Sequence, residues 1–151
     1  MIFENASLIK EDLLLPALDA PAMFIPIGAT PVSAGFPSPA EDYAHKRLDI
    51  NEYLVRNPVS TFFFTVKGDS MQEADIFEGD ILVVDRSLEP AHGHIVVAFV
   101  NGERLVKRLS IREGKVMLLA GNPAYPALIL RGETELEVWG VAIGKFKRIP
   151  V

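Results

Sequence analysis

Beyond residue 60, the chain is a succession of short runs rich in β-branched and aromatic residues. Glycines and Asn or Pro residues separate the runs, as expected for strands joined by turns. We expect strands at residues 61–66, 81–85, 95–100, 104–111, 116–120, 128–130 and 135–146. The pattern therefore predicts a mainly β fold.

The clearest turn lies at the Asn-Gly pair of residues 101–102. Asn-Gly between two apolar runs favours a two-residue hairpin turn of type I′. If Val100 then pairs with Glu103, the antiparallel register places Val96 opposite Lys107. The sequence therefore predicts both the hairpin and its register.

This hairpin places one lysine on the apolar side of its strand. Side chains alternate between the faces of a strand, so Lys107 shares a face with Leu105 and Leu109. Burial there disfavours the ammonium form and lowers the pKa of the lysine, so a neutral amine is available as a base. The alternative is a side chain that reaches solvent over the leucines. The opposite and wetter face is expected to carry Arg104, Arg108 and Ser110.

The first forty residues have a different character. Residues 20–40 contain no charged side chain, but their five prolines rule out a membrane-spanning helix. Residues 32–34, Val-Ser-Ala, resemble a signal-peptide cleavage site, but the basic segment that begins such a signal is missing. We expect an extended, mobile arm.

A helix start is predicted where this arm ends. Residues 38–41, Ser-Pro-Ala-Glu, combine a capping serine, proline at the first helical position and an acid three residues after the serine. A short helical stretch should follow and end near Asn57 and Pro58.

Composition narrows the possible functions. The chain has 151 residues, 49% of them hydrophobic, which favours one domain with one substantial core. Its net charge of -5 argues against a protein that binds nucleic acid by neutralising phosphates. The absence of cysteine excludes disulfides and thiolate metal sites, and is compatible with a reducing cytosol.

Ser70 is the candidate nucleophile, in the stretch Gly-Asp-Ser-Met of residues 68–71. A serine hydroxyl needs a nearby base, and Lys107 is the candidate named above. A Ser/His/Asp triad would use His45, His92 or His94, but their spacing singles out none.

Other chemistry has weaker support in the sequence. The His-Gly-His stretch of residues 92–94 lacks carboxylate or thiolate companions, so we expect a loop and no metal. We expect the side chains of Asp69 and Asp80 to bond to turn backbone.

Five segments resemble the UmuD/LexA family of self-cleaving serine peptidases: AGFPSPAEDY, GDSM, EGDILVVD, HGHIVVAFVNGERLVKRL and VWGVAIGKFK. The resemblance spans residues 33–146. It implies that Ser70 is the nucleophile, Lys107 the general base and Ala34-Gly35 the cleaved bond. Backbone N–H groups of Ser70 and Met71 are candidates for the oxyanion hole. The sequence departs from the family at residue 94, where an acid is common and this chain has histidine.

The resemblance also implies an architecture. It predicts a curved, mainly antiparallel β-domain with short helices at residues 35–151, preceded by an extended arm, residues 1–34, that self-cleavage removes. It implies a homodimer and no cofactor.

Two branches of this family differ in what precedes the cleavage site. LexA-like repressors have a DNA-binding domain there, whereas residues 1–34 are proline-rich and poor in basic residues, so no direct sequence-specific DNA binding is expected. The UmuD branch implies a cytoplasmic SOS-response protein, with no membrane association, whose cleavage is stimulated by the recombinase filament on single-stranded DNA. Its shortened form is the accessory subunit of an error-prone translesion DNA polymerase, joining the catalytic subunit. The alternatives are a repressor fragment of LexA or phage type, or a binding module without catalysis, although Ser70 and Lys107 together argue against the latter.

Overall fold

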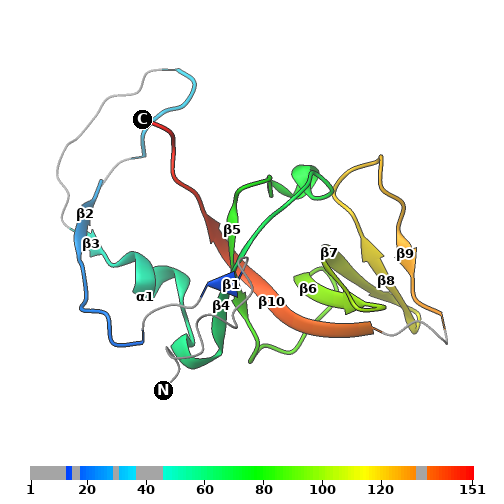
Figure 1. The fold of residues 1–151 in the computed structure, drawn as a ribbon. Coiled ribbons are helices and arrows are strands. Elements are labelled where there is room, and N and C mark those ends of the chain that lie inside the picture. Colours follow the sequence, from blue (N-terminus) through cyan, green and yellow to red (C-terminus); the bar gives the residue numbers. More distant parts are fainter. Residues whose placement is uncertain (1–12, 15–17, 29–30, 37–45, 132–135) are drawn as a thin grey trace.

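The computed structural model describes residues 13–14, 18–28, 31–36, 46–131 and 136–151, and these form a mainly β structure (Figure 1). Eight strands form one antiparallel sheet in the order β1-β4-β5-β10-β6-β7-β8-β9, and β2 pairs with β3 separately. The strands are β1 (Leu13–Leu14), β2 (Ile25–Ile27), β3 (Lys46–Leu48), β4 (Thr61–Thr65), β5 (Ile81–Asp85), β6 (Ile95–Val100), β7 (Glu103–Arg112), β8 (Lys115–Leu119), β9 (Leu128–Ile129) and β10 (Leu136–Phe146).

The predicted fold class is confirmed. Each of the seven predicted strands forms, and their ends differ from the prediction by one residue at most. Residue 135, the expected start of the last strand, lies outside the described residues. Alternating apolar runs and turn residues are local signals, which explains why they locate the strands well.

β10 connects the two halves of the sheet. It pairs with β6 through its first half and with β5 through its second, with register shifts at Gly140 and Gly144 (Figure 1). A Cβ at Gly140 would lie 2.7 Å from Cγ1 of Val84 and 3.3 Å from the carbonyl oxygen of Asp85. Glycine is therefore required where β10 bulges and passes close to β5.

The helical region is shorter than predicted. The expected start at residues 38–41 lies outside the described residues. Lys46–Leu48 forms β3 instead, because it pairs with the arm segment Ile25–Ile27. The helix α1 (Ile50–Leu54) begins after Asp49, whose Oδ1 accepts the N–H of Asn51 at 3.0 Å. A second short element, the 3₁₀ helix η2 (Pro58–Ser60), follows where the helix was expected to end.

The described parts of residues 1–34 include two short strands. β1 adds to the edge of β4, with Leu13 opposite Phe64 and Leu14 opposite Phe63. Residues 18–28 and 31–36 are exposed. No helix among the described residues is long and apolar enough to cross a membrane.

Most of the buried apolar residues form two clusters. The first cluster comprises Phe64, Val66, Met71, Ile76, Leu82, Val84 and Val97. The second comprises Val96, Ala98, Leu109, Leu118 and Val141. Met71 follows the candidate nucleophile directly, so the first cluster anchors the segment that carries Ser70.

Candidate active site

The hairpin of β6 and β7 forms as predicted. Asn101 has φ 49° and Gly102 has φ 82°, so both central residues have the positive φ that a type I′ turn requires. Val100 is opposite Glu103, and Val96 is opposite Lys107. The predicted register is therefore confirmed.

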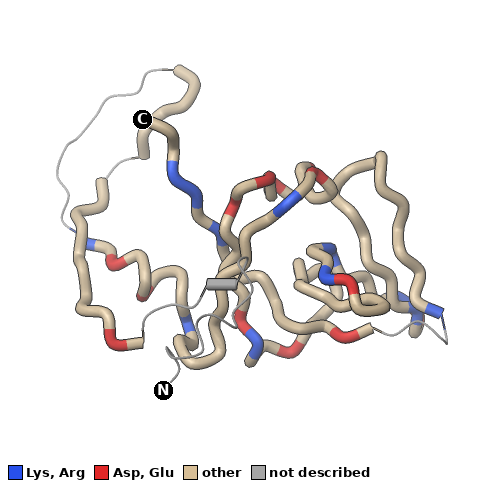
Figure 2. The backbone as a smooth tube through the Cα atoms, viewed as in Figure 1, with Lys and Arg blue, Asp and Glu red and all other residues tan. Residues whose placement is uncertain are grey.

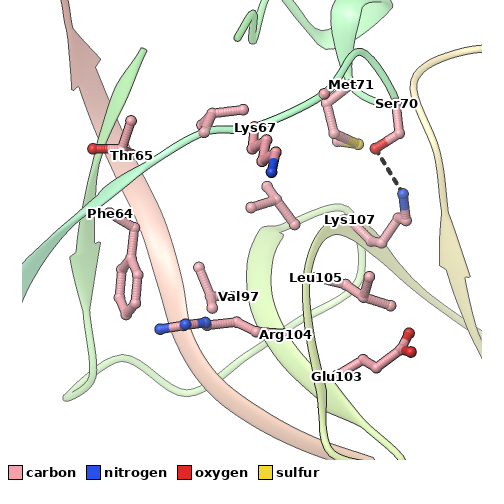
Figure 3. A pocket seen from close by; sticks show the side chains of 13 residues that line it. Phe64, Thr65, Lys67, Ser70, Met71, Val97, Glu103, Arg104, Leu105 and Lys107 are labelled. Atoms are coloured by element: carbon pink, nitrogen blue, oxygen red, sulfur yellow. Dashed lines mark hydrogen bonds between the residues drawn. The ribbon is translucent and has the colours of Figure 1, made fainter. Parts of the chain in front are cut away.

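Lys107 is buried beside Ser70. Only 7% of its surface is exposed, and its Nζ donates a hydrogen bond to Oγ of Ser70 at 2.7 Å (Figure 3). Burial lowers the pKa of the Lys107 ammonium below its ordinary value. The alternative, a side chain extended to solvent, is wrong. The geometry therefore places a lysine whose pKa is lowered within hydrogen-bond distance of the candidate nucleophile.

The opposite face of β7 is less wet than predicted. Arg108 is exposed, but Ser110 is only 2% exposed and Arg104 is half-buried, with its guanidinium 5.5 Å from the ring centroid of Phe64. Strand alternation specifies which residues share a face, but what packs over that face is decided by other segments.

Ser70 lies on a tight turn between β4 and the 3₁₀ helix η3 (Gln72–Ala74). Gly68, two residues earlier, has φ +87°, which is costly for any other residue. Ser70 itself is half-buried, whereas Met71 is 2% exposed. The backbone N–H groups of Ser70 and Met71 donate to no partner among the described residues. They remain available for an oxyanion.

The loop of residues 121–125 supports this turn, and the sequence did not single it out. The N–H of Gly121 donates to the carbonyl oxygen of Ser70 at 2.7 Å, and its own carbonyl accepts from the N–H of Glu73 at 2.7 Å. A Cβ at Gly121 would lie 3.1 Å from the backbone nitrogen of Ala74 and 3.2 Å from Cα of Met71. The Gly-Asn-Pro stretch signals a turn, but its contact with the serine turn is tertiary.

The same loop contacts Asp69. Nδ2 of Asn122 donates to the carbonyl oxygen of Asp69 at 3.0 Å, and the hydroxyl of Tyr125 donates to its Oδ1 at 2.6 Å. The prediction that the Asp69 side chain bonds to turn backbone is therefore wrong, because its partner comes from a distant loop. Oδ2 of Asp80 does accept the turn N–H of Phe77 at 2.8 Å, as predicted.

Two cavities flank the Ser70–Lys107 pair. One, of about 500 Å³, lies between the serine turn and β7 (Figure 3). Its apolar lining consists of Phe64, Val66, Met71, Val97, Leu105 and Val106. The other, of about 360 Å³, lies against Tyr125, Pro126 and Leu128.

The predicted cleavage site is not at this pair. Residues 31–36 are exposed and line neither cavity. Figure 1 shows this segment at the end of the molecule opposite β7 and β8. Within it, the N–H of Gly35 donates to Oγ of Ser33 at 3.3 Å, and that hydroxyl donates to the carbonyl oxygen of Phe36. The structure therefore brings Ser70 and Lys107 together, but not Ala34 and Gly35.

The two histidines of the 92–94 stretch accept hydrogen bonds from backbone N–H groups. Nδ1 of His92 accepts the N–H of Ile111 at 3.0 Å, and Nδ1 of His94 accepts that of Ala91 at 3.1 Å. The predicted loop is confirmed, with Gly93 at φ +89°. His45 lies outside the described residues, and neither His92 nor His94 lines a cavity that contains Ser70. The described residues contain no cluster of three His, Asp or Glu side chains able to hold a metal.

Charges around the pair come from the serine turn and the start of β7. Lys67 and Asp69 precede Ser70, while Glu103 and Arg104 precede Lys107 on β7. Figure 2 shows acidic and basic residues distributed along the described backbone, including this hairpin. A peptide bound here therefore meets both signs of charge at the rim of an apolar site.

Comparison with known proteins places the chain in a family. Residues 26–143 match the family described as Peptidase S24-like. The chain is 43% identical to Protein MucA of Escherichia coli over 128 residues, or 84% of this chain and 87% of MucA. It is 47% identical to Protein SamA of Salmonella typhimurium over 108 residues, or 72% and 74% of the two chains. It is 32% identical to the LexA repressor of Bordetella pertussis over 120 residues, or 80% and 55%. The chain thus belongs to the Peptidase S24-like family.

Proposed function

We propose that the protein is a serine peptidase that cleaves its own chain between Ala34 and Gly35, with Ser70 as nucleophile and Lys107 as general base. One observation carries the proposal: a buried lysine nitrogen lies 2.7 Å from a serine oxygen at the junction of two cavities. Because burial lowers the pKa of Lys107, its neutral amine is accessible at a lower pH than that of an ordinary lysine.

The chemistry follows from this pairing. Neutral Lys107 takes the hydroxyl proton of Ser70 as Oγ attacks the carbonyl carbon of Ala34. The N–H groups of Ser70 and Met71 stabilise the resulting oxyanion. The new ammonium protonates the leaving nitrogen of Gly35, which breaks the peptide bond and leaves Ala34 as an ester on Ser70. Lys107, neutral again, then takes a proton from the water that attacks this ester, and returns it to Oγ of Ser70 as the bond from Oγ to the Ala34 carbonyl carbon breaks.

Cleavage requires residues 31–36 to move. In the structure they line neither cavity beside Ser70 and lie at the end of the molecule opposite β7, so this arrangement represents the uncut protein with the bond outside the site (Figure 1). The arm has to enter the cavities beside Ser70, in its own chain or in a dimer partner. We propose that the recombinase filament on single-stranded DNA favours this inserted state, and that cleavage within the chain or the dimer then proceeds with prearranged reactants.

We also propose a role for the product. Residues 35–151 would act as the homodimeric accessory subunit of a translesion DNA polymerase in the SOS response, following the resemblance to UmuD proteins. The higher identity to MucA, 43% against 32% for the LexA repressor, supports this branch over a repressor.

The cleavage product tests the site assignment. On prolonged incubation of the purified protein, intact mass should show two fragments, and N-terminal sequencing of the larger should read Gly35, Phe36, Pro37. The small residues on both sides of this bond suit a close approach to a nucleophile on a tight turn. A different new N-terminus would overturn the cleaved bond while leaving Ser70 and Lys107 in place.

Partner binding should depend on the arm. β1 covers the edge of β4, and the rest of the described arm is exposed and largely apolar, so removing residues 1–34 frees a strand edge and alters the apolar surface. We expect the polymerase catalytic subunit to bind residues 35–151 about tenfold or more tightly than the full chain, a difference of at least ~1.4 kcal/mol. Calorimetric titration of both proteins measures this difference. Equal affinities would rule out gating by the arm.

A further inference from the structure

Tyr125 contacts both sides of the Ser70–Lys107 pair. Its hydroxyl donates to Oδ1 of Asp69, the residue before Ser70, at 2.6 Å. The centroid of its ring lies 5.5 Å from Nζ of Lys107. One side chain thus bonds to the neighbour of the nucleophile and also faces the base.

We propose that Tyr125 is a positioning residue for self-cleavage: its hydroxyl holds the turn that carries Ser70, and its ring stabilises the ammonium that Lys107 becomes during the reaction. This inference rests on the proposed Ser/Lys peptidase function and adds a residue that the cleavage chemistry itself does not require.

The hydroxyl makes one of four hydrogen bonds between the 121–125 loop and the segment of the serine turn and η3. The N–H of Gly121 donates to the Ser70 carbonyl, the Gly121 carbonyl accepts from the N–H of Glu73, and Asn122 donates to the Asp69 carbonyl. The hydrogen bond from Tyr125 ends on a carboxylate, and hydrogen bonds to charged acceptors are the stronger kind. Without this hydrogen bond the position of Oγ is less well fixed, and small displacements of a nucleophile lower the rate of the reaction.

The ring acts at a different stage. The face of an aromatic ring attracts an ammonium ion but has no comparable attraction for a neutral amine. Lys107 is neutral before it takes the serine proton and charged afterwards. The contact therefore strengthens as the transition state is approached, which is the property required of a group that accelerates a reaction.

Other charged groups near Lys107 are the same in every Tyr125 variant. The serine turn contributes Lys67 and Asp69, and β7 contributes Glu103 and Arg104. The hydrogen bond to Asp69, with the negative charge of that residue, raises the pKa of Tyr125 itself. The phenol therefore keeps its proton to a higher pH than an ordinary tyrosine does.

Two substitutions separate the hydroxyl from the ring. Tyr125→Phe keeps the ring, so self-cleavage should slow about tenfold at every pH, with the midpoint of the pH–rate profile unchanged. Tyr125→Leu removes both. Its midpoint should fall by about half a pH unit to one unit, and its loss of rate should be greater above the midpoint than below it. If the ring had a purely structural role, Tyr125→Leu would instead lower the rate equally at all pH values.

A second readout does not depend on activity. In the Ser70→Ala background the chain is expected to stay uncut, so NMR of isotope-labelled lysine side chains follows the titration of Lys107 directly. The pKa of Lys107 should be lower with Tyr125→Leu than with Tyr125→Phe. Tyr125→Met provides a second ring-free side chain should the leucine variant fail to fold. Tyr53→Leu, an exposed tyrosine on α1 outside both cavities, is the matched control and should change neither rate nor midpoint.

A double-mutant cycle tests the hydroxyl. If it acts through Asp69, Tyr125→Phe should cost little in an Asp69→Asn protein, where the charged acceptor is already lost. If the losses of rate from Tyr125→Phe and Asp69→Asn were additive, the proposed role of the hydroxyl would be overturned.

The outcomes distinguish the inference from the function on which it rests. Unchanged rate and midpoint in Tyr125→Leu, with Ser70→Ala inactive, would overturn the role of Tyr125 alone. A loss of rate in Tyr125→Leu that is equal at all pH values, with an unchanged pKa of Lys107, would overturn the role of the ring. Cleavage that persists in Ser70→Ala would instead overturn the peptidase mechanism itself.

Discussion

Ser70→Ala and Lys107→Arg are each expected to lower the rate of self-cleavage by about a thousandfold or more. The first removes the attacking oxygen. The second keeps a positive charge and much of the side-chain length, but a guanidinium cannot give up its proton in the pH range of the assay. First-order rates of product formation, followed by intact mass, measure both effects.

Controls must separate chemistry from folding. Ser70 is half-buried and Lys107 lies beside a cavity, so we expect both variants to keep the native circular dichroism spectrum and a similar melting temperature. Lys115→Arg, an exposed change on β8, is the matched substitution and should cleave like the parent protein. An active Lys107→Arg protein would remove Lys107 from the mechanism.

The cleavage rate should rise with pH over the range in which Lys107 loses its proton. Only the neutral amine accepts the serine proton, so below the pKa of Lys107 the rate gains close to tenfold per pH unit and levels off above it. Because burial lowers this pKa, the plateau should be reached below the ordinary lysine value of about 10.4. Rates between pH 6 and pH 11 test the prediction, with the circular dichroism spectrum recorded at each pH.

A histidine base gives a different profile. Its ordinary pKa is about 6.5, so the rate would already be level near neutrality. A profile that flattens there would contradict a lysine base, and would direct attention to His45, which lies outside the described residues.

The strands and the hairpin were predictable because their signals are local. Asn101-Gly102 suits a type I′ turn whatever surrounds it, and that turn sets the pairing of Val96 with Lys107. The helix was predicted less well, because Lys46–Leu48 pairs with Ile25–Ile27, a partner some twenty residues away in the chain. Helix signals in a short stretch of sequence carry no information about a distant segment that pairs with it as a strand.

The candidate site was predictable only in part. Spacing and resemblance identified Ser70 and Lys107, but the choice between a buried lysine and one extended to solvent depended on packing around β7. Gly121, Asn122 and Tyr125 were not identified, because their contacts with the serine turn join residues about fifty positions apart.

By itself, the sequence determined the strands, the turn, the hairpin register and the two side chains that carry the proposed chemistry. Each of these depends on residue type and short-range spacing. Only the tertiary structure decided that Lys107 is buried against Ser70, that the 121–125 loop supports the serine turn, and that residues 31–36 line neither cavity of the site. Burial and distance are properties of all the segments packed together, so no single segment of the sequence contains them.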